Sequence, residues 1–445
     1  MLNTIWVAMI VGAIVCGALT GNLDAVAKAS TDSAKAGVEL AIGLVGVMAF
    51  WLGLMKVLHQ GGLLTAMARL MRPVMKRLFP EVPEDHPAMS MMILNMVSNM
   101  LGLGNAATPF GLKAMMELNK LNPHPGTATN SMALFLAINT SGLAVLPTGM
   151  IAIRASLGAE APGSIFLTTI LATLLSTAVA IVVARVMCRL PAYRMESGGA
   201  GAVELKTVEV ADTIDTSVVE DEFAQGQQEV SPKQRMVGAG LVLVVVAAFV
   251  VALNRRASEV VDGELMGWAG ALKSALTDWP LVILIVGFVL FGVCRGVKVY
   301  DAIVEGGKEG FDVALKIIPY LVAILVAVGM LRASGAIDIL VNGLAPVTAL
   351  VGMPAETLPM ALLRSLSGSG AFAVSAELMQ THGPDSLIGN IVSTMQGSTE
   401  TTFYVLALYF GAVQVRNTRH TLWACLAADL TGVLGAVWFC RWLLV

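Results

Sequence analysis

The sequence predicts an all-α polytopic membrane protein made of two inverted repeats, each with an interfacial helix, a re-entrant hairpin and a broken transmembrane helix. The first observation behind this prediction is composition. Of the 445 residues, 56% are hydrophobic and only 13% are charged, and the mean hydropathy is +0.77. Soluble domains carry about 25% charged residues, so most of this chain is expected to lie in lipid. The other two observations are polar breaks inside apolar segments and an internal repeat.

Composition and motifs also exclude several classes of function. The five cysteines form no CxxC pair and the five histidines lack ligand spacing, so we expect neither disulfides nor a bound metal. No basic block points to nucleic acid. Gly102 and Gly104 are not followed by the Lys-Ser/Thr of a phosphate loop, and Ser367-Gly368-Ser369-Gly370 does not fit Gly-x-Ser-x-Gly. We therefore expect neither an enzyme nor a bound cofactor.

Apolar runs in the sequence predict membrane-spanning helices, each of which needs about 20 residues. The runs are residues 2–19, 38–58, 131–153, 165–187, 236–253, 281–294, 313–331, 388–413 and 421–443. The first run lacks the basic start of a cleaved signal, so it is predicted to be a retained span. The sixth is short unless it extends into Trp279-Pro280.

Four further segments do not fit a simple span. Residues 62–79 and 336–351 are amphipathic and are predicted to lie in the membrane interface. Residues 87–121 and 359–381 are apolar stretches interrupted by glycines and small polar residues. Each arm of these stretches is too short to cross the membrane, so each stretch predicts a re-entrant hairpin of two half-helices.

The order of these segments recurs along the chain. Residues 60–73 match 333–346 at an offset of 273, and His124 pairs with His382 at an offset of 258. The two copies begin at the second and seventh spans, so they are predicted to enter the membrane from opposite sides. With a cytoplasmic N-terminus, 19 of the 28 Lys and Arg residues lie inside, as the positive-inside bias requires. The predicted domains are residues 1–190 and 234–445, joined by a flexible acidic cytoplasmic linker at 191–233.

Candidate substrate-binding residues lie at the four helix breaks. Paired breaks in two halves of a membrane protein indicate a transporter's binding site, because lipid cannot satisfy the exposed backbone. In the first half the candidates are Asn95, Asn99, Asn105, Thr108, Asn139, Thr140 and Ser141. In the second half they are Ser367, Ser369, Gln396, Ser398, Thr399 and Glu400. Amide side chains both donate and accept hydrogen bonds, which suits a neutral or zwitterionic solute. The alternative role is capping and packing of the half-helices.

Three charged residues near these breaks have alternative interpretations. Glu400, near the middle of a span, must face protein or water. It would couple transport to Na⁺ or H⁺, bind a ligand hydroxyl or amine, pair with an internal arginine, or be a protonated structural group. Arg364 would contact an anion or anchor its hairpin at the interface. Glu377 lies on the returning arm of the second hairpin and would be either functional or close to the surface.

Two motifs carry a family resemblance. Residues 99–109, Asn-Met-Leu-Gly-Leu-Gly-Asn-Ala-Ala-Thr-Pro, continued by Asn-Thr-Ser-Gly at 139–142, resemble the spore maturation A proteins. Residues 364–371, Arg-Ser-Leu-Ser-Gly-Ser-Gly-Ala, with Gln-Gly-Ser-Thr-Glu-Thr at 396–401, resemble the spore maturation B proteins. The resemblance covers nearly the whole chain except the linker. It implies a fused, single-chain form of the kind found in Gram-negative bacteria, within the nucleoside recognition, gate-domain family, and it need not imply sporulation.

That family is similar to the membrane parts of concentrative nucleoside transporters and of the ferrous iron transporter gate. The resemblance therefore implies inverted repeats of a hairpin plus a broken helix. From the residues and the resemblance together, we expect a secondary transporter of a small polar solute, nucleoside-like or amino-acid-like, coupled to Na⁺ or H⁺. It would be a multi-pass homo-oligomer surrounded by lipid in the bacterial inner (cytoplasmic) membrane. The alternatives are a membrane sensor or assembly partner that does not transport, and a passive channel.

Overall fold

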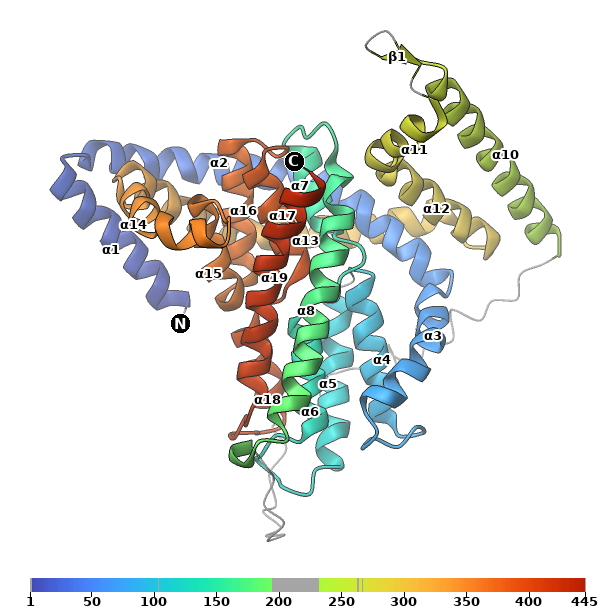
Figure 1. Cartoon of the computed structure of the whole chain (residues 1–445), viewed down its shortest axis with the longest axis horizontal. Coiled ribbons are helices and arrows are strands. Elements are labelled where there is room, and N and C mark those ends of the chain that lie inside the picture. The colour runs from blue at the N-terminus through green and yellow to red at the C-terminus, as the bar shows by residue number, and fades with distance from the viewer. Residues whose placement is uncertain (1, 103, 194–231, 262–263, 266, 445) are drawn as a thin grey trace.

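The computed structural model describes residues 2–102, 104–193, 232–261, 264–265 and 267–444. Helices make up almost all of this part of the chain (Figure 1). The two strands described, β1 (Val260–Val261) and β2 (Glu264–Leu265), form a two-residue antiparallel ladder. The all-helical class predicted from the sequence is therefore confirmed.

The helices fall into two sets with the same order of long and short elements. The first set is α1 (Leu2–Thr20), α2 (Leu23–Gln60), α3 (Leu63–Leu78), α4 (Pro87–Met100), α5 (Gly104–Lys120), α6 (Asn130–Thr140), α7 (Thr148–Ser156) and α8 (Ile165–Met187). The second is α12 (Pro280–Cys294), α13 (Val299–Ala333), α14 (Ala336–Leu350), α15 (Leu358–Leu366), α16 (Gly368–His382), α17 (Leu387–Ser398), α18 (Thr402–Ala412) and α19 (Thr421–Leu443). Between them lie α10 (Pro232–Ala257) and α11 (Gly267–Asp278).

The predicted breaks and hairpins occur as separate helices. The predicted span 131–153 is α6 and α7, and the predicted span 388–413 is α17 and α18. The hairpin arms are short: at 1.5 Å per residue, α4 is about 21 Å long and α15 about 14 Å. The two predicted interfacial segments are the helices α3 and α14. Most of the predicted linker lies outside the described residues.

Within the described residues, three helices are long and apolar enough to cross a membrane by themselves: Pro162–Met187, Met236–Ala257 and Thr421–Leu443. Trp6–Thr20 and Val282–Cys294 are shorter apolar helices. The helix α10 exposes large apolar side chains on several sides, among them Leu243, Val244 and Val250. A helix with apolar side chains all round is stable in lipid and not in water. The chain is therefore a membrane protein.

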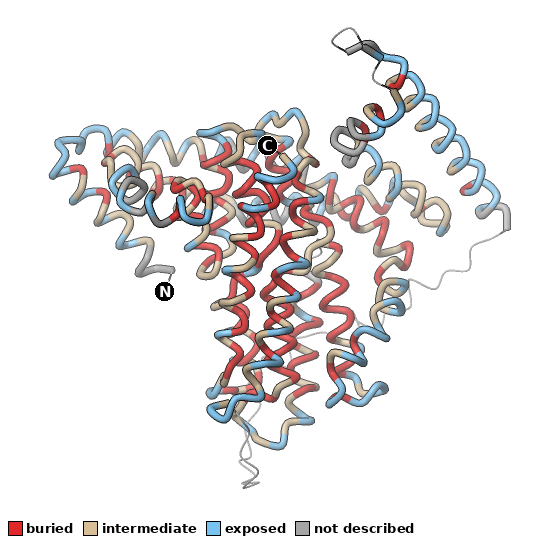
Figure 2. Tube along the Cα trace, viewed as in Figure 1, coloured by how far each residue is buried: buried red, intermediate tan, exposed pale blue. Residues whose placement is uncertain are grey.

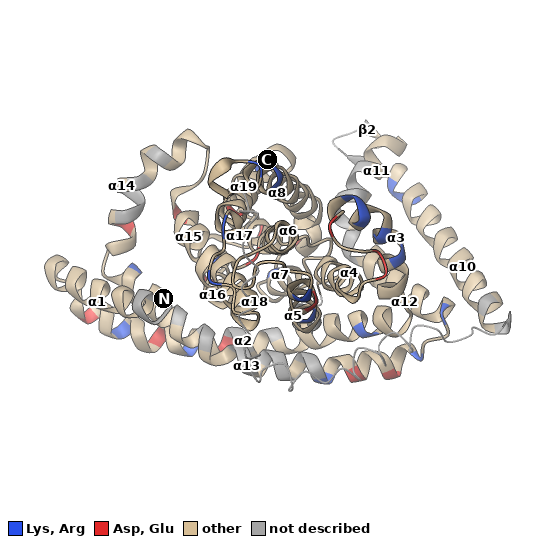
Figure 3. Ribbon diagram, turned by 90° about the horizontal axis from the view of Figure 1, so that it is seen from below, with Lys and Arg blue, Asp and Glu red and all other residues tan. Residues whose placement is uncertain are grey.

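Corresponding helices of the two sets pack against each other in opposite directions. A Cβ on Gly53 of α2 would lie 2.6 Å from the carbonyl oxygen of Ile303 in α13, and one on Gly37 would lie 3.1 Å from Cα of Val322. The helices α2 and α13 are therefore antiparallel. Figure 3 shows this long pair running along one side of a central bundle of shorter helices. The bundle holds most of the buried residues (Figure 2).

The helices α8 and α19 lie side by side in the bundle and also run in opposite directions. Near one end, Arg419 of the loop before α19 donates a hydrogen bond of 3.0 Å from Nε to the carbonyl oxygen of Tyr193, which follows α8. In the middle, the Ser176 hydroxyl of α8 donates to the carbonyl oxygen of Ala428 at 2.8 Å. His420, next to Arg419, is buried and contacts the Tyr193 ring edge-on, with ring centroids 5.9 Å apart.

His420 gives the folded protein a predicted sensitivity to acid. Burial, reinforced by the charge of Arg419, lowers the pKa of His420 from 6.5 to about 4. Between these two values the unfolded chain binds a proton that the folded chain does not bind, so stability that is complete above pH 6.5 falls as the pH decreases. We expect the melting temperature to fall less between neutral and mildly acidic pH in His420→Gln than in the original protein. Equal decreases in both proteins would contradict this assignment.

Candidate functional site

The two broken helices meet each other at their breaks. The amide N–H of Glu400, in the break between α17 and α18, donates to the carbonyl oxygen of Thr140 at the end of α6, at 2.9 Å. Gly142, in the other break, has φ of +61°, and a Cβ there would lie 2.7 Å from the carbonyl carbon of Thr399. Only glycine adopts this conformation without strain and lets the two backbones approach so closely. The two halves of the chain are therefore joined directly at the breaks.

Both hairpin tips lie against these breaks. The carbonyl oxygen of Met100, at the end of α4, accepts hydrogen bonds from the N–H groups of Val145 and Leu146 in the first break. The other hairpin turns at Ser367, whose hydroxyl accepts from the N–H of Gly370 at 3.1 Å and so caps the start of α16. Serine is a favoured residue at this position because its oxygen satisfies an N–H that the helix cannot.

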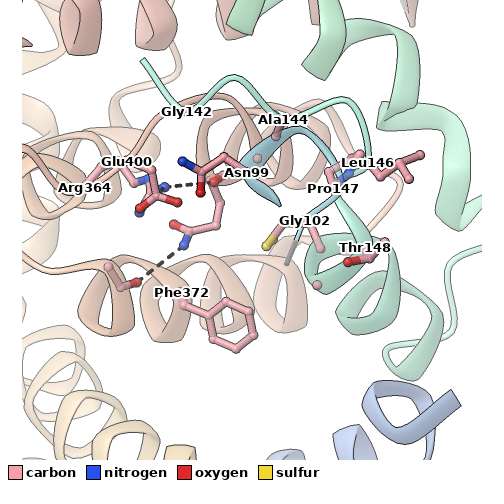
Figure 4. A pocket seen from close by; sticks show the side chains of 15 residues that line it. Asn99, Gly102, Gly142, Ala144, Leu146, Pro147, Thr148, Arg364, Phe372 and Glu400 are labelled. Carbon is pink, nitrogen blue, oxygen red and sulfur yellow. Dashed lines mark hydrogen bonds and ion pairs between the residues drawn. The ribbon is translucent and has the colours of Figure 1, made fainter. Parts of the chain in front are cut away.

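A cavity of about 260 Å³ lies where the tips and breaks converge (Figure 4). Each of the four interruptions contributes to its wall. The contributing residues include Asn99 and Gly102 from the first hairpin, Pro147 and Thr148 from the first break, Arg364, Gly368 and Phe372 from the second hairpin, and Gln396 and Glu400 from the second break. Figure 4 shows Glu400, Arg364 and Asn99 together toward one end of the cavity and Leu146, Pro147 and Thr148 toward the other.

Arg364 closes the end of the half-helix α17. Its Nε donates to the Thr399 hydroxyl at 3.1 Å, and its Nη2 donates to the carbonyl oxygens of Gln396 at 3.2 Å and of Thr399. The last carbonyl groups of a helix have no partner within the helix and carry partial negative charge, so a guanidinium is well suited to this position. Arg364 is 3% exposed. A side chain buried to this extent does not act as an interfacial anchor, whereas contact with an anion stays a prediction, because Arg364 also lines the cavity.

Glu400 presents a carboxylate to the cavity. Its side chain is 48% exposed, whereas that of its neighbour Arg364 is 4% exposed, and the closest charged atoms are 3.7 Å apart. This separation makes a weak ion pair rather than a hydrogen bond. Glu400 therefore pairs with an internal arginine, one of the predicted alternatives, while it keeps acceptor oxygens available to a solute.

Asn95 and Asn139 form a buried network behind the cavity. Asn139 Nδ2 donates to Asn95 Oδ1 at 2.8 Å, and Asn95 Nδ2 donates to the carbonyl oxygen of Ala107 at 2.7 Å. The hydroxyl of Tyr409 in α18 accepts from Asn95 at 3.4 Å. The network thus ties the first hairpin to the first break and to the second broken helix. Asn99 joins it by donating to Asn139 Oδ1 at 3.3 Å, and Asn99 alone of these amides lines the cavity.

The other predicted site residues lie around this network. Thr140 and Ser141 donate their hydroxyls to carbonyl oxygens of α6, and Ser398 and Thr399 donate theirs to the carbonyl oxygen of Met395 in α17. These contacts fit the alternative role given in the sequence analysis, which is capping and packing of the half-helices. Ser369 is exposed and Thr108 is half-buried, and neither is among the described residues that line the cavity. The side chain of Asn105 lies outside the described residues.

Several residues near the site were not predicted from the sequence. Phe372 places an aromatic ring in the cavity, and Tyr409 anchors the asparagine network. Asp429 is buried in the middle of α19. The rule that identified Glu400, a carboxylate inside an apolar span, would also have identified Asp429. Glu377, in contrast, forms an ion pair of 2.6 Å with Arg332 and is not among the cavity-lining residues described.

The fold and site define a class of helical membrane protein whose polar cavity is built at paired helix breaks. The model of the nucleoside recognition (Gate) family matches residues 41–198 and 314–416, more than half of the chain. The chain belongs to the nucleoside recognition gate family.

The chain is also similar to two known proteins, each over part of its length. The chain is similar to spore maturation protein B of Bacillus subtilis (strain 168), with 46% identity over 155 residues, which cover 35% of this chain and 87% of that protein. It is also similar to spore maturation protein A of the same organism, with 44% identity over 172 residues, which cover 39% of this chain and 88% of that protein. Each relative matches only part of the chain, as expected for a fusion of the two. No solved structure matches the chain.

Proposed function

We propose that this protein is a secondary transporter that binds a small polar solute in the cavity between the two hairpin tips and the two broken helices. The observation that carries the proposal is that all four helix interruptions, two from each half, contribute residues to one polar cavity. Irregular backbone at membrane depth is tolerated where it lines such a cavity, and transporters bind substrate at such sites. The volume of about 260 Å³ suits a small solute.

The lining favours a solute with both donor and acceptor groups. Glu400 supplies acceptor oxygens, and Oε1 of Gln396 is buried without a hydrogen-bond partner in the part of the chain that the structure describes. The start of α16 at Gly368 supplies the positive end of a helix dipole to an acceptor or an anion. Phe372 supplies a ring on which a flat group can stack. A nucleoside-like or amino-acid-like solute has these features, and the family description supports the first.

The transport mechanism that we propose is alternating access between two inverted repeats. Its support is that α2 packs against α13, and α8 against α19, with corresponding helices in opposite directions. In this arrangement α4–α5 and α15–α16 are re-entrant hairpins that enter from opposite sides. The N-terminus would be cytoplasmic, the membrane would be the bacterial inner membrane, and Na⁺ or H⁺ would drive transport. Exposed apolar helices such as α10 would contact lipid or a second copy of the chain.

Thermal stability gives the direct test of solute binding. Purified protein would be melted with nucleosides, amino acids, small carboxylates and polyamines, each with and without Na⁺. A solute at 100 times its dissociation constant should stabilise the folded protein by about 2.7 kcal/mol. We expect one chemical class to raise the melting temperature. Glu400→Gln should remove most of this shift, because it loses the only carboxylate among the cavity-lining residues described.

The matched control is Glu305→Gln, which changes a carboxylate that pairs with Lys56 on the surface of α13. It should retain the full shift. Uptake into liposomes then separates the alternatives: a transporter accumulates the solute against its gradient, a channel only equilibrates it, and a sensor does neither. If no solute class shifts the melt of well-folded protein, the solute-binding proposal fails and the assembly-partner alternative gains support.

A further inference from the structure

Asp429 is a carboxylate that the solute site does not use. It lies in the middle of α19, one of the three long apolar helices, and is 5% exposed. The hydroxyls of Ser365 and Thr402 lie near its carboxylate, and the positive charge of Arg364 acts on it from a greater distance. Yet neither carboxylate oxygen has a hydrogen-bond partner among the described residues, and the buried hydroxyl of Thr402 has none either. An ionised carboxylate in this position is poorly compensated.

Arg364 lines the cavity and interacts electrostatically with Asp429, which is not among the described residues that line it. Both Asp429 and Glu400 attract its positive charge. Its donors, however, are directed at the carbonyl oxygens and hydroxyl at the end of α17, so Asp429 receives none of them. One cationic group is therefore shared by two carboxylates, one in the cavity and one buried behind it. A single positive charge balances a single negative charge, so the second carboxylate is costly to keep ionised.

We propose that Asp429 is a proton-binding site that is coupled through Arg364 to Glu400. When the cavity is empty, Glu400 balances Arg364 and Asp429 carries a proton as a neutral carboxyl group. When a cationic donor group of the solute, such as an ammonium, pairs with Glu400, it takes over the negative charge that balanced Arg364, and Asp429 releases its proton to water and balances Arg364 instead. One proton leaves for each solute that binds, and one returns when the solute departs. The release of the proton on solute binding rests on the proposed function, whereas the proton site itself does not.

The chemistry of the site favours a proton over a metal cation. A sodium ion would need several oxygen ligands and would lie beside the positive guanidinium of Arg364. The site offers one carboxylate and the hydroxyls of Ser365 and Thr402. Within the described residues no group of three or more His, Cys, Asp and Glu is arranged to hold a metal ion. A protonated Asp429 can instead donate a hydrogen bond to the Thr402 hydroxyl, which would give both buried groups a partner.

Infrared spectroscopy tests the proton site without any solute. The full-length protein in lipid at neutral pH should show the carbonyl stretch of a protonated carboxyl group, identified by its shift in D₂O. We expect this band to be lost in Asp429→Asn. It should also be lost in Glu400→Gln, because Asp429 then becomes the only counter-charge to Arg364 and ionises. Asp85→Asn, the same change at a side chain that is 99% exposed, should retain the band.

Other outcomes would overturn the proposal. If the band is absent from the original protein, or is still present in Asp429→Asn, then Asp429 is not the protonated group. A band lost in Glu400→Gln but kept in Asp429→Asn assigns the proton to Glu400. If the band is still present in Glu400→Gln, the proposed coupling through Arg364 is refuted. The Glu400→Gln spectrum also tests the proposal if Asp429→Asn fails to fold. Failure of every solute to shift the melt would leave these spectra unchanged, so the two proposals fail separately.

Discussion

Replacing Gly142 with alanine is expected to destabilise the folded protein strongly, because the position combines a left-handed backbone with a close backbone contact. The residue has φ of +61°, which costs an alanine about 1–2 kcal/mol. Its Cβ would also lie 2.7 Å from the backbone of Thr399, and overpacking of this kind costs about 1–3 kcal/mol. The backbone of Thr399 can move away only by straining the adjacent hydrogen bond from Glu400 to Thr140. The expected total is about 2–5 kcal/mol, seen as a lower melting temperature.

The control for this experiment is Gly411→Ala in α18. A Cβ at Gly411 meets no atom within 4 Å, and its φ is not in the left-handed region. Alanine there should be neutral or stabilising by up to about 1 kcal/mol, because alanine favours the helix. If both variants melted at the same temperature, the close approach of the two breaks at Gly142 would be refuted. Loss of the solute-induced shift in Gly142→Ala would also be expected, since the same contact forms the cavity wall.

Replacing Arg364 with methionine is the second change with a large expected effect. It leaves the carbonyl oxygens of Gln396 and Thr399 without their donor and leaves the carboxylate of Glu400 without its counter-charge. A buried acceptor left without its donor costs about 1–3 kcal/mol, so the loss of both bonds should destabilise the protein by roughly 2–6 kcal/mol. The melting temperature of Arg364→Lys should lie between those of the original protein and of Arg364→Met. Lysine keeps the positive charge but lacks the planar guanidinium that donates to several acceptors. The measurement is the melting temperature of each purified variant.

Arg72→Met provides the comparison at an exposed ion pair. Arg72 pairs with Asp85 at 3.4 Å, and both side chains are largely in solvent. Exposed pairs contribute about 0–1 kcal/mol, so this variant should melt close to the original protein. Similar melting temperatures for Arg364→Met and Arg72→Met would show that Arg364 does not hold the end of α17.

The sequence predicted the helix breaks well because their cause is local. At residues 139–142 and 396–402, small polar residues and glycine interrupt an apolar helix, and the described helices end at Thr140 and Ser398 as expected. Hydropathy was less informative for α2, where the apolar window begins at residue 38 but the helix begins at Leu23. The added segment contains Asp24, Lys28 and Asp32, which are compatible with a helix but not with a long apolar run.

The sequence predicted that the cavity would lie at the helix breaks, but it identified only some of the residues that line it. Asn99, Gln396 and Glu400 line the cavity, whereas Asn95 and Asn139 face each other behind it. Residues four apart share a helix face, but that rule cannot decide which of Asn95 and Asn99 reaches the cavity. The contact of Asn95 with Tyr409 joins residues 314 positions apart. No local pattern encodes such a contact, since it depends on how the two halves pack.

The hydrogen bond between Glu400 and Thr140 has a consequence for how the chain is assembled. Because residues from both halves line the cavity and the two backbones meet there, neither half alone encloses it. The two halves are therefore arranged like the subunits of a heterodimer within one polypeptide. Residues 194–231, which connect them, need supply no binding energy; a covalent connection acts by raising the effective concentration of one half near the other. Fusion then guarantees equal amounts of both halves and makes their association independent of protein concentration.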